Sequence, residues 1–278
     1  MDFAKRYLKK LFKLFTRPEL KVLPGNIAFF LVLSIFPIIT LSGYLASFFN
    51  VSLNSVIDLF YRILPDNISD ILVSYITGNG MDFHVGFSII TGYIVASNGA
   101  QSIIVSCNTL YGFEHKSYIK IRLKALFITI LLVFLFIFTL FVLAFGNSIL
   151  KIVLSFNIFD GIGDSIYYVF LLLKWPIAIV FIYFMMKVIF VVSPNSYIKN
   201  NLTTRGALFT SIAWILSTFI YSFYVQHFSH YDIFYGSLSN IIIMMMWIYI
   251  LAYSLVIGIA INVQSYKDYL DNKDSSIV

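Results

Sequence analysis

Residues 125–147 read ALFITILLVFLFIFTLFVLAFGN, and this stretch decides the fold. From Ala125 to Phe145 it carries no charged side chain, and its polar side chains are Thr129 and Thr139. A helix needs about 20 apolar residues to cross the ~30 Å hydrocarbon layer of a bilayer. The stretch is therefore long and apolar enough to predict a transmembrane helix.

Five other apolar stretches on either side of this one predict further spans, at 26–49, 84–107, 166–192, 206–227 and 237–263. The second and fifth spans in chain order contain hydroxyl and amide side chains, which can hydrogen-bond to neighbouring helices in a membrane. Alternating segments of about 10 residues, the mark of a transmembrane strand, do not occur. The sequence predicts an all-α polytopic bundle of six transmembrane helices.

Composition supports this fold class. The 278 residues are 60% hydrophobic and 12% charged, with a mean hydropathy of +0.89. Soluble domains carry about 25% charged residues. Too few charges remain to cover a soluble surface, which excludes a cytosolic enzyme and a disordered chain. The single cysteine, Cys107, excludes an internal disulfide scaffold and a cysteine-based metal site.

The distribution of Lys and Arg predicts the orientation, because cytoplasmic segments are enriched in these residues. Most of the 19 Lys and Arg lie in 1–25, in the connections 108–124 and 193–205, and in 264–278. The alternate loops carry only Arg62 and Lys151, together with several Asp. Both termini are therefore predicted to be cytoplasmic. The net charge of +6 then faces the anionic inner leaflet and needs no nucleic-acid partner.

The chain is predicted to form a single membrane domain, 1–278. An amphipathic helix over 3–17 is interpreted as a topological anchor, with anionic-lipid sensing as the alternative. Apolar residues at helical spacing on both sides of Pro65 predict two short external helices, as packing elements or as a lid. The predicted parts are the cytoplasmic basic segment 1–25, the bundle 26–263 with the external segment 51–83, and the cytoplasmic tail 264–278.

Several motifs resemble the YihY/BrkB family of bacterial inner-membrane proteins over about residues 20–265. The first span resembles the family's Ala-Tyr-Tyr…Leu-Ser-Leu-Phe-Pro, with Phe29 and Phe30 replacing the tyrosines. The other matching motifs are Asn108-Thr-Leu-Tyr111-Gly112, Lys174-Trp175-Pro176, Ser193-Pro194-Asn195, Gly206-Ala207 with Trp214, and Tyr235-Gly236-Ser237-Leu238 with Trp247-Ile-Tyr249.

One departure from the family limits the mechanism that the resemblance implies. Family members often end their last span with Gly-Ala-Glu-Leu-Asn, whereas this chain has Gly258-Ile-Ala260-Ile-Asn262 and no carboxylate. The resemblance implies a location in the bacterial cytoplasmic membrane. The older family label of ribonuclease BN is generally regarded as a misassignment.

The sequence predicts no catalytic, cofactor or metal site, and hence no enzyme. The histidines form no His-x-His or His-Glu-x-x-His motif, and the predicted internal loops are too short for a soluble active site. His227 and His230 lie three residues apart with Asp232 beside them, a pattern interpreted as solvated interfacial residues rather than a metal site.

Charges within the predicted spans are the more informative feature. No span contains Asp or Glu, which disfavours proton or sodium coupling through a buried carboxylate. The fourth span contains Lys174 and Lys187. Both lysines can extend to the membrane borders with their stems in lipid. The neighbouring Pro176 frees a backbone carbonyl, which favours a functional role for Lys174.

Polar residues concentrate in the first, second, fifth and sixth spans, which predicts a central cleft between them with Lys174 at its outer half. Hydrogen bonding between helices is the alternative interpretation of each amide. The predicted cleft or substrate residues are Lys174, Trp175, Pro176, Asn98, Gln101, Asn108, Gln226, Tyr235, Asn240 and Asn262.

Two functions follow from these patterns. A cleft with a cation and without carboxylates would suit a transporter or lipid-handling protein whose partners are membrane lipids and an anionic amphiphile. The alternative is a non-transporting scaffold for envelope or cell-surface assembly, with the external segment 51–83 as a contact surface.

Overall fold

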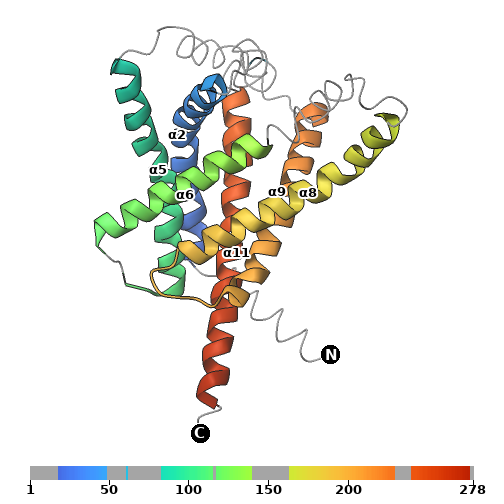
Figure 1. Ribbon diagram of the computed structural model, residues 1–278. Coiled ribbons are helices and arrows are strands. Elements are labelled where there is room, and N and C mark those ends of the chain that lie inside the picture. Colours follow the sequence, from blue (N-terminus) through green and yellow to red (C-terminus); the bar gives the residue numbers. More distant parts are fainter. Residues whose placement is uncertain are drawn as a thin grey trace.

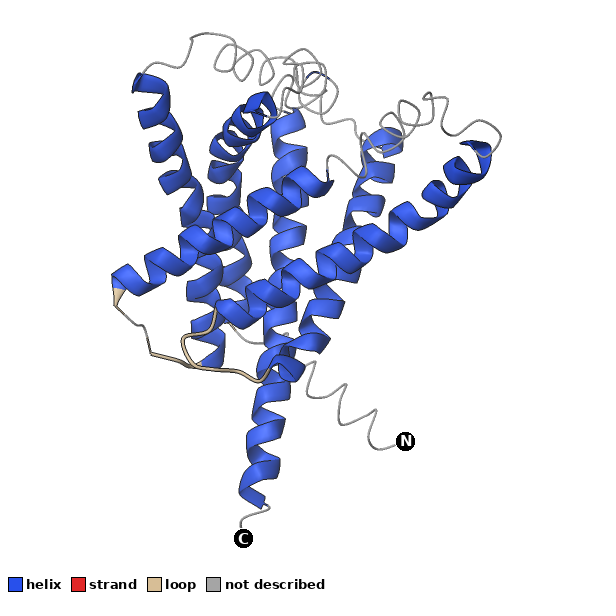
Figure 2. Cartoon of the chain, in the orientation of Figure 1, coloured by secondary structure: helices blue, strands red, loops and turns tan. Residues whose placement is uncertain are grey.

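The computed structural model describes residues 18–48, 61, 83–114, 117–139, 163–228 and 239–275, and towards several helix ends it describes the helical backbone alone. All described elements are helices, which confirms the predicted all-α class (Figure 2). The elements in chain order are α2 (Glu19–Phe48), α5 (Phe83–Tyr111), α6 (Tyr118–Thr139), α8 (Gly163–Val192), the 3-10 helix η3 (Asn200–Thr203), α9 (Thr204–Phe228) and α11 (Ser239–Ser275).

Helix α11 is the central element of the bundle. It packs against α2, α5 and α9, while α6 packs on α5 and α8 packs on both α6 and α9. Figure 1 shows α6 and α8 running obliquely across the bundle and the last turns of α11 projecting beyond it. The polar sequence after Asn262 fits that projection, because those turns have little apolar surface to bury.

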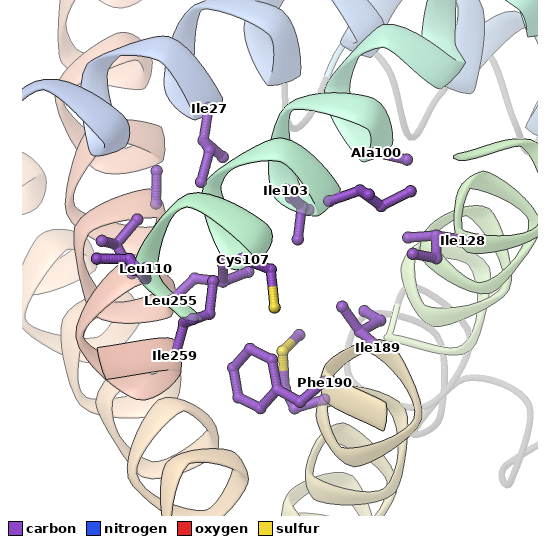
Figure 3. Packing of buried hydrophobic residues seen from close by; sticks show 14 of the residues in the cluster. Ile27, Ala100, Ile103, Cys107, Leu110, Ile128, Ile189, Phe190, Leu255 and Ile259 are labelled. Atoms are coloured by element: carbon purple, nitrogen blue, oxygen red, sulfur yellow. The ribbon is translucent and has the colours of Figure 1, made fainter. Parts of the chain in front are cut away.

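The apolar core lies where these helices meet. Figure 3 shows Ile103 and Cys107 of α5 close to Phe190 of α8 and to Leu255 and Ile259 of α11. Each of these side chains is at most 1% exposed. In a membrane bundle such packing stabilises through the many van der Waals contacts of each buried side chain, so this region holds the helices together.

The closest approach of two backbones is between α9 and α11. A methyl group added at Gly206 would collide with the carbonyl oxygen of Gly258 and with the side chain of Asn262. A methyl group added at Gly258 would collide with the hydroxyl of Thr210 and lie 3.2 Å from Phe190. Small residues allow such contacts, which are typical of helix pairs in membranes.

Hydrogen bonds from side chains to backbone join α2 to α5 and add to the contact between α9 and α11. The Ser34 hydroxyl of α2 lies 3.0 Å from the Ala96 carbonyl oxygen of α5, beside the closely packed Gly99. The Trp214 indole of α9 donates to the Leu251 carbonyl of α11 at 3.0 Å. Polar side chains therefore serve as interhelical contacts at both places.

The contact between α6 and α8 is of a different kind, because aromatic rings form it. The Phe138 and Phe181 rings stack with centroids 3.6 Å apart, and Phe134 lies 5.7 Å from Phe181. Ring stacking adds to the burial energy by about 0.5–1.5 kcal/mol per pair.

Several helices extend beyond the predicted apolar spans, because hydropathy follows apolar side chains, whereas a helix ends where its backbone hydrogen bonds end. Helix α6 begins at Tyr118, so the predicted loop 108–124 shrinks to 112–117 and Arg122 and Lys124 are helical. Helix α2 begins at Glu19, within the segment assigned to 1–25. Helix α11 continues to Ser275, through most of the predicted tail 264–278.

Within the described residues, one stretch, Ile242–Lys273, is long and apolar enough to cross a membrane, and Pro176–Val192 forms a shorter apolar helix. The predicted helix over 3–17 lies outside the described residues. So does the predicted external segment 51–83, apart from Tyr61 and the first residue of α5.

Candidate functional site

The most distinctive polar group of the described structure is Arg122 on α6. Its Nη1 donates to Asn98 Oδ1 and to Gln101 Oε1, both at 2.8 Å, and its Nη2 donates to the Ile94 carbonyl oxygen at 2.8 Å. All three acceptors lie on one face of α5, because they are three or four residues apart. We call these four residues the Arg122 clamp.

The position of the clamp along α5 follows from helix geometry. At a rise of about 1.5 Å per residue, Gln101 and Asn98 lie roughly 15 and 20 Å from Tyr111, the last residue of α5. Tyr111 packs with Phe113 and with Tyr266 in an aromatic cluster. This cluster joins the last turn of α5 to the C-terminal part of α11. The guanidinium is therefore level with the middle of α5 rather than with its end.

Among the described residues, the clamp leaves the charge of Arg122 without a counter-charge. Its acceptors are two amide oxygens and one peptide carbonyl, all of which are neutral. An arginine side chain stays protonated at any physiological pH. In a low-dielectric environment, such a cation favours the approach of an anion.

Exposed apolar side chains surround the clamp. On α5, Ile90 and Ile94 are 61% and 45% exposed and precede Asn98 on the same helix face. On α6, the exposed apolar residues recur at helical spacing and form a stripe of Ile119, Leu123, Phe127, Ile130 and Phe134. We call this set the α6 stripe.

Asn108 holds a second polar junction, between α5 and the turn that follows α8. Its Nδ2 donates to the Ser193 carbonyl at 3.3 Å and to the Ile104 carbonyl at 2.8 Å. Its Oδ1 accepts a hydrogen bond from the Asn195 backbone amide at 2.7 Å. Asn108 is fully buried, so these bonds satisfy groups that water cannot reach.

Two further contacts strengthen that junction. Asn195 Nδ2 donates to the Glu114 carbonyl at 2.9 Å, and Lys124 Nζ of α6 donates to the Pro194 carbonyl at 2.6 Å. The Ser193-Pro194-Asn195 motif therefore forms a turn held by α5, α6 and the loop between them.

At the same end of the molecule, Lys199 lies over Tyr269 of α11, with its Nζ 4.6 Å from the ring centroid. A hydrogen bond with the Tyr269 side chain raises the pKa of Lys199. Both groups are close to water, so this contact adds a weak link between the loop and α11.

Asn262 takes part in the crossing of α9 and α11. Its Oδ1 accepts a hydrogen bond from the Gly206 backbone amide at 2.8 Å, and Gly206 lies in the first turn of α9. The first amides of a helix have no partner within the helix, so Asn262 satisfies one of them. Its Nδ2 is buried and has no hydrogen-bond partner in the part of the chain that the structure describes.

Among the predicted residues of α8, the structure describes the side chain of Pro176 but only the helical backbone of Lys174 and Trp175. Pro176 is exposed and lines an apolar groove of about 490 Å³ between α6 and α8. Lys187 lies further along α8, and its Nζ donates weakly to the Tyr183 hydroxyl at 3.4 Å.

The structure describes no side chain for the three remaining predicted residues. Gln226 and Asn240 lie in α9 and α11, whose backbone alone is described there, and Tyr235 lies outside the described residues. Among the described residues, no three His, Cys, Asp or Glu side chains lie together as a metal site would require.

The structure separates the predicted cleft residues into three places. Asn98 and Gln101 meet Arg122 on α6, Asn108 meets the turn after α8, and Asn262 meets α9. Each of these amides makes a contact between elements, and the region between α2, α5 and α11 is filled by core side chains. Apolar grooves lie instead on α11 and between α6 and α8.

Sequence reasoning missed Arg122, because it assigned this residue to a loop and counted it as a topological charge. The sequence did contain a pattern that indicates this site. Ile94, Asn98 and Gln101 share one helix face by their spacing, so two amides follow an isoleucine on that face. That face indicates a polar partner on the neighbouring helix, although it does not identify which one.

Comparison with known proteins agrees with the motifs noted above. Residues 11–276 match the model of the family described as Virulence factor BrkB. The chain belongs to this family. Because the match extends over almost the entire sequence, the BrkB assignment applies to all of the helices described here.

Two BrkB-like relatives are informative. YfkH of Bacillus subtilis, which is named a ribonuclease-like protein, is 29% identical over 266 residues, 94% of this chain and 95% of YfkH. The UPF0761 membrane protein IL2447 of Idiomarina loihiensis is 30% identical over 94 residues, 34% of this chain and 32% of that protein. No solved structure matches the chain. The chain is thus a BrkB-family protein, and one of its relatives is named a membrane protein.

Proposed function

We propose that this BrkB-family chain is a six-span protein of the bacterial cytoplasmic membrane, with both termini in the cytoplasm, that binds an anionic amphiphile at the Arg122 clamp. The topology is supported by the six long helices and by the bias of Lys and Arg towards one set of connections. The anionic ligand is supported by the charge of the clamp.

The observation that carries this proposal is a cation whose neutral partners lie near the middle of α5. A charged residue within a membrane is costly to place there, and such residues face partners or binding sites. The partners of Arg122 satisfy part of its hydrogen bonding but none of its charge. An anionic ligand would supply the missing charge.

Lateral binding from the bilayer is favoured over passage through the middle of the bundle. The side chains between α2, α5 and α11 are packed, as the near-zero exposure of Ile27, Ala100 and Val256 indicates. The clamp instead lies beside exposed apolar residues, where the tail of an amphiphile can remain in the lipid. Lys174 remains a second candidate cation for this ligand.

The packed core also favours one alternative function, a membrane scaffold that transports nothing. That role would need no ligand at Arg122, so lipid binding separates the two proposals. We propose a non-enzymatic role in either case; ribonuclease activity of the purified chain, measured with and without divalent metal, would contradict it.

Replacing Arg122 tests the ligand. We expect Arg122→Gln to weaken binding of an anionic phospholipid, phosphatidylglycerol, by about 10-fold or more, as loss of charge-assisted hydrogen bonds implies. Native mass spectrometry of the purified protein, titrated with the lipid, measures this directly. Lys120→Gln is the matched control, since it removes the same charge from an exposed position on the same helix.

Equal loss in the two variants would mean that binding follows net charge alone, and no loss in either would remove the clamp from the function. Thermal unfolding of both variants checks that the fold persists. Arg122→Lys keeps the charge but lacks the planar array of donors, so we expect it to restore part of the binding.

Cysteine labelling tests the topology. We expect an impermeant maleimide to label Ser52→Cys in intact cells and to label Asp271→Cys only after the membrane is opened. The native Cys107 is 1% exposed and should stay unlabelled in the folded protein. Labelling of Asp271→Cys from outside would reverse the proposed orientation.

A further inference from the structure

The N–H donors of Arg122 that the clamp does not use suit a particular kind of ligand group. A guanidinium has five N–H donors, and the clamp uses three of them, two on Nη1 and one on Nη2. The Nε–H and the second Nη2–H have no partner among the described residues. Two donors on one guanidinium suit two oxygens of a single anionic group.

The choice between a carboxylate and a phosphate follows from the apolar surroundings. For a carboxylic acid in such surroundings, burial raises the pKa and the guanidinium lowers it, so its charge depends on the balance of the two. A phosphodiester keeps its negative charge there, since its ionisation lies far below neutral pH. A permanently charged guanidinium therefore pairs best with a phosphate ester.

The surface beside Arg122 supplies a place for the rest of such a ligand. Tyr118 is 66% exposed and lies one turn before Arg122 on the same face of α6. The α6 stripe begins next to Tyr118 at Ile119 and runs for about four turns along the neighbouring face of α6, with Leu123 at 63% and Phe134 at 53% exposure. A polar group and an apolar surface thus lie beside one another on a single helix, as the headgroup and the tails do in a phospholipid.

We propose that the Arg122 clamp and the α6 stripe form a binding site for one phospholipid, with its phosphate on the free Nε–H and Nη2–H of Arg122 and an acyl chain along the stripe. This inference rests on the proposed function, because it specifies the anionic amphiphile and its placement. Charge complementarity sets the headgroup position, and the exposed apolar side chains set the direction of the tail.

Photo-crosslinking tests the placement. The full-length protein is mixed with phosphatidylglycerol that carries a diazirine midway along one acyl chain, irradiated, digested and mapped by mass spectrometry. We expect adducts within 118–134 of α6 and 90–101 of α5, reduced about 10-fold or more in Arg122→Gln and within about twofold of wild type in Lys120→Gln. Adducts mainly on α8 and α9 would overturn the placement.

A second probe separates this inference from the proposed function. A fatty acid with the same diazirine should label the site about 10-fold less than the phospholipid, because it lacks a permanent charge. Equal or stronger labelling by the fatty acid, still dependent on Arg122, would overturn the phosphate and leave the anionic amphiphile standing. Labelling that is independent of Arg122 for both probes would overturn both proposals.

Inorganic phosphate completes the test. Because the site as proposed gains part of its affinity from the acyl chain, millimolar phosphate should leave the lipid adducts unchanged. Displacement of the lipid by phosphate alone would identify a site for the free ion and overturn the phospholipid assignment.

Discussion

Gly206→Ala is expected to lower the melting temperature of the purified protein by about 2–12 °C. The new methyl group would meet the backbone carbonyl of Gly258, which cannot move without shifting α11. Overpacking of this kind costs about 1–3 kcal/mol, and each kcal/mol lowers the melting temperature by about 2–4 °C in a chain of this size. Thermal unfolding in detergent, followed by tryptophan fluorescence, measures the shift.

Gly25→Ala is the matched control, because the same methyl group in α2 would meet nothing within 4 Å. Removing a helical glycine is then expected to stabilise the protein by about 0.5–1 kcal/mol. If Gly206→Ala melted like Gly25→Ala, the close contact between α9 and α11 would be contradicted.

A pair of substitutions, Gly258→Ala and Thr210→Ala, tests the same contact from α11. At Gly258 the colliding group is the hydroxyl of Thr210, a side chain that can be removed. Adding Thr210→Ala to Gly258→Ala should therefore recover part of the lost stability, so that the effects of the two substitutions are not additive.

The second large effect is expected for Asn108→Ala, with a loss of about 2–4 kcal/mol. This substitution leaves the buried Asn195 backbone amide and the Ser193 carbonyl without their partner. An unsatisfied buried group costs about 1–3 kcal/mol. The same unfolding measurement reports the loss as a lower melting temperature.

Thr109→Ala is the neighbouring control. Thr109 is exposed, and its hydroxyl bonds only to the Val105 carbonyl one turn earlier. Its replacement should change stability by no more than about 0.5 kcal/mol. Equal melting temperatures for the two variants would mean that Asn108 does not hold the turn after α8.

The sequence predicted the existence and order of the helices because apolar runs of sufficient length leave few alternatives. It predicted their ends less well. Arg122 and Lys124 interrupt the apolar pattern, yet the backbone of α6 continues through both, since a helix tolerates charged residues whose side chains find acceptors.

The candidate site was less predictable than the fold. Helical spacing places Asn98 and Gln101 on one face, but the partner of that face depends on how α6 crosses α5. Likewise, a glycine such as Gly206 allows close packing without indicating that Gly258 lies opposite. Such pairings depend on the three-dimensional packing of distant segments, which a local pattern does not encode.

The glycine contact also has a mechanical consequence. Where α9 meets α11 at Gly206 and Gly258, backbone touches backbone, with the short side chains of Thr210 and Asn262 packed beside the contact. Between α6 and α8, by contrast, the contact consists of the side-chain rings of Phe138 and Phe181, which a displacement can reorient without moving backbone against backbone. Movements of the helices relative to one another should therefore concentrate at the contact between Phe138 and Phe181, while α9 and α11 move together as one rigid unit.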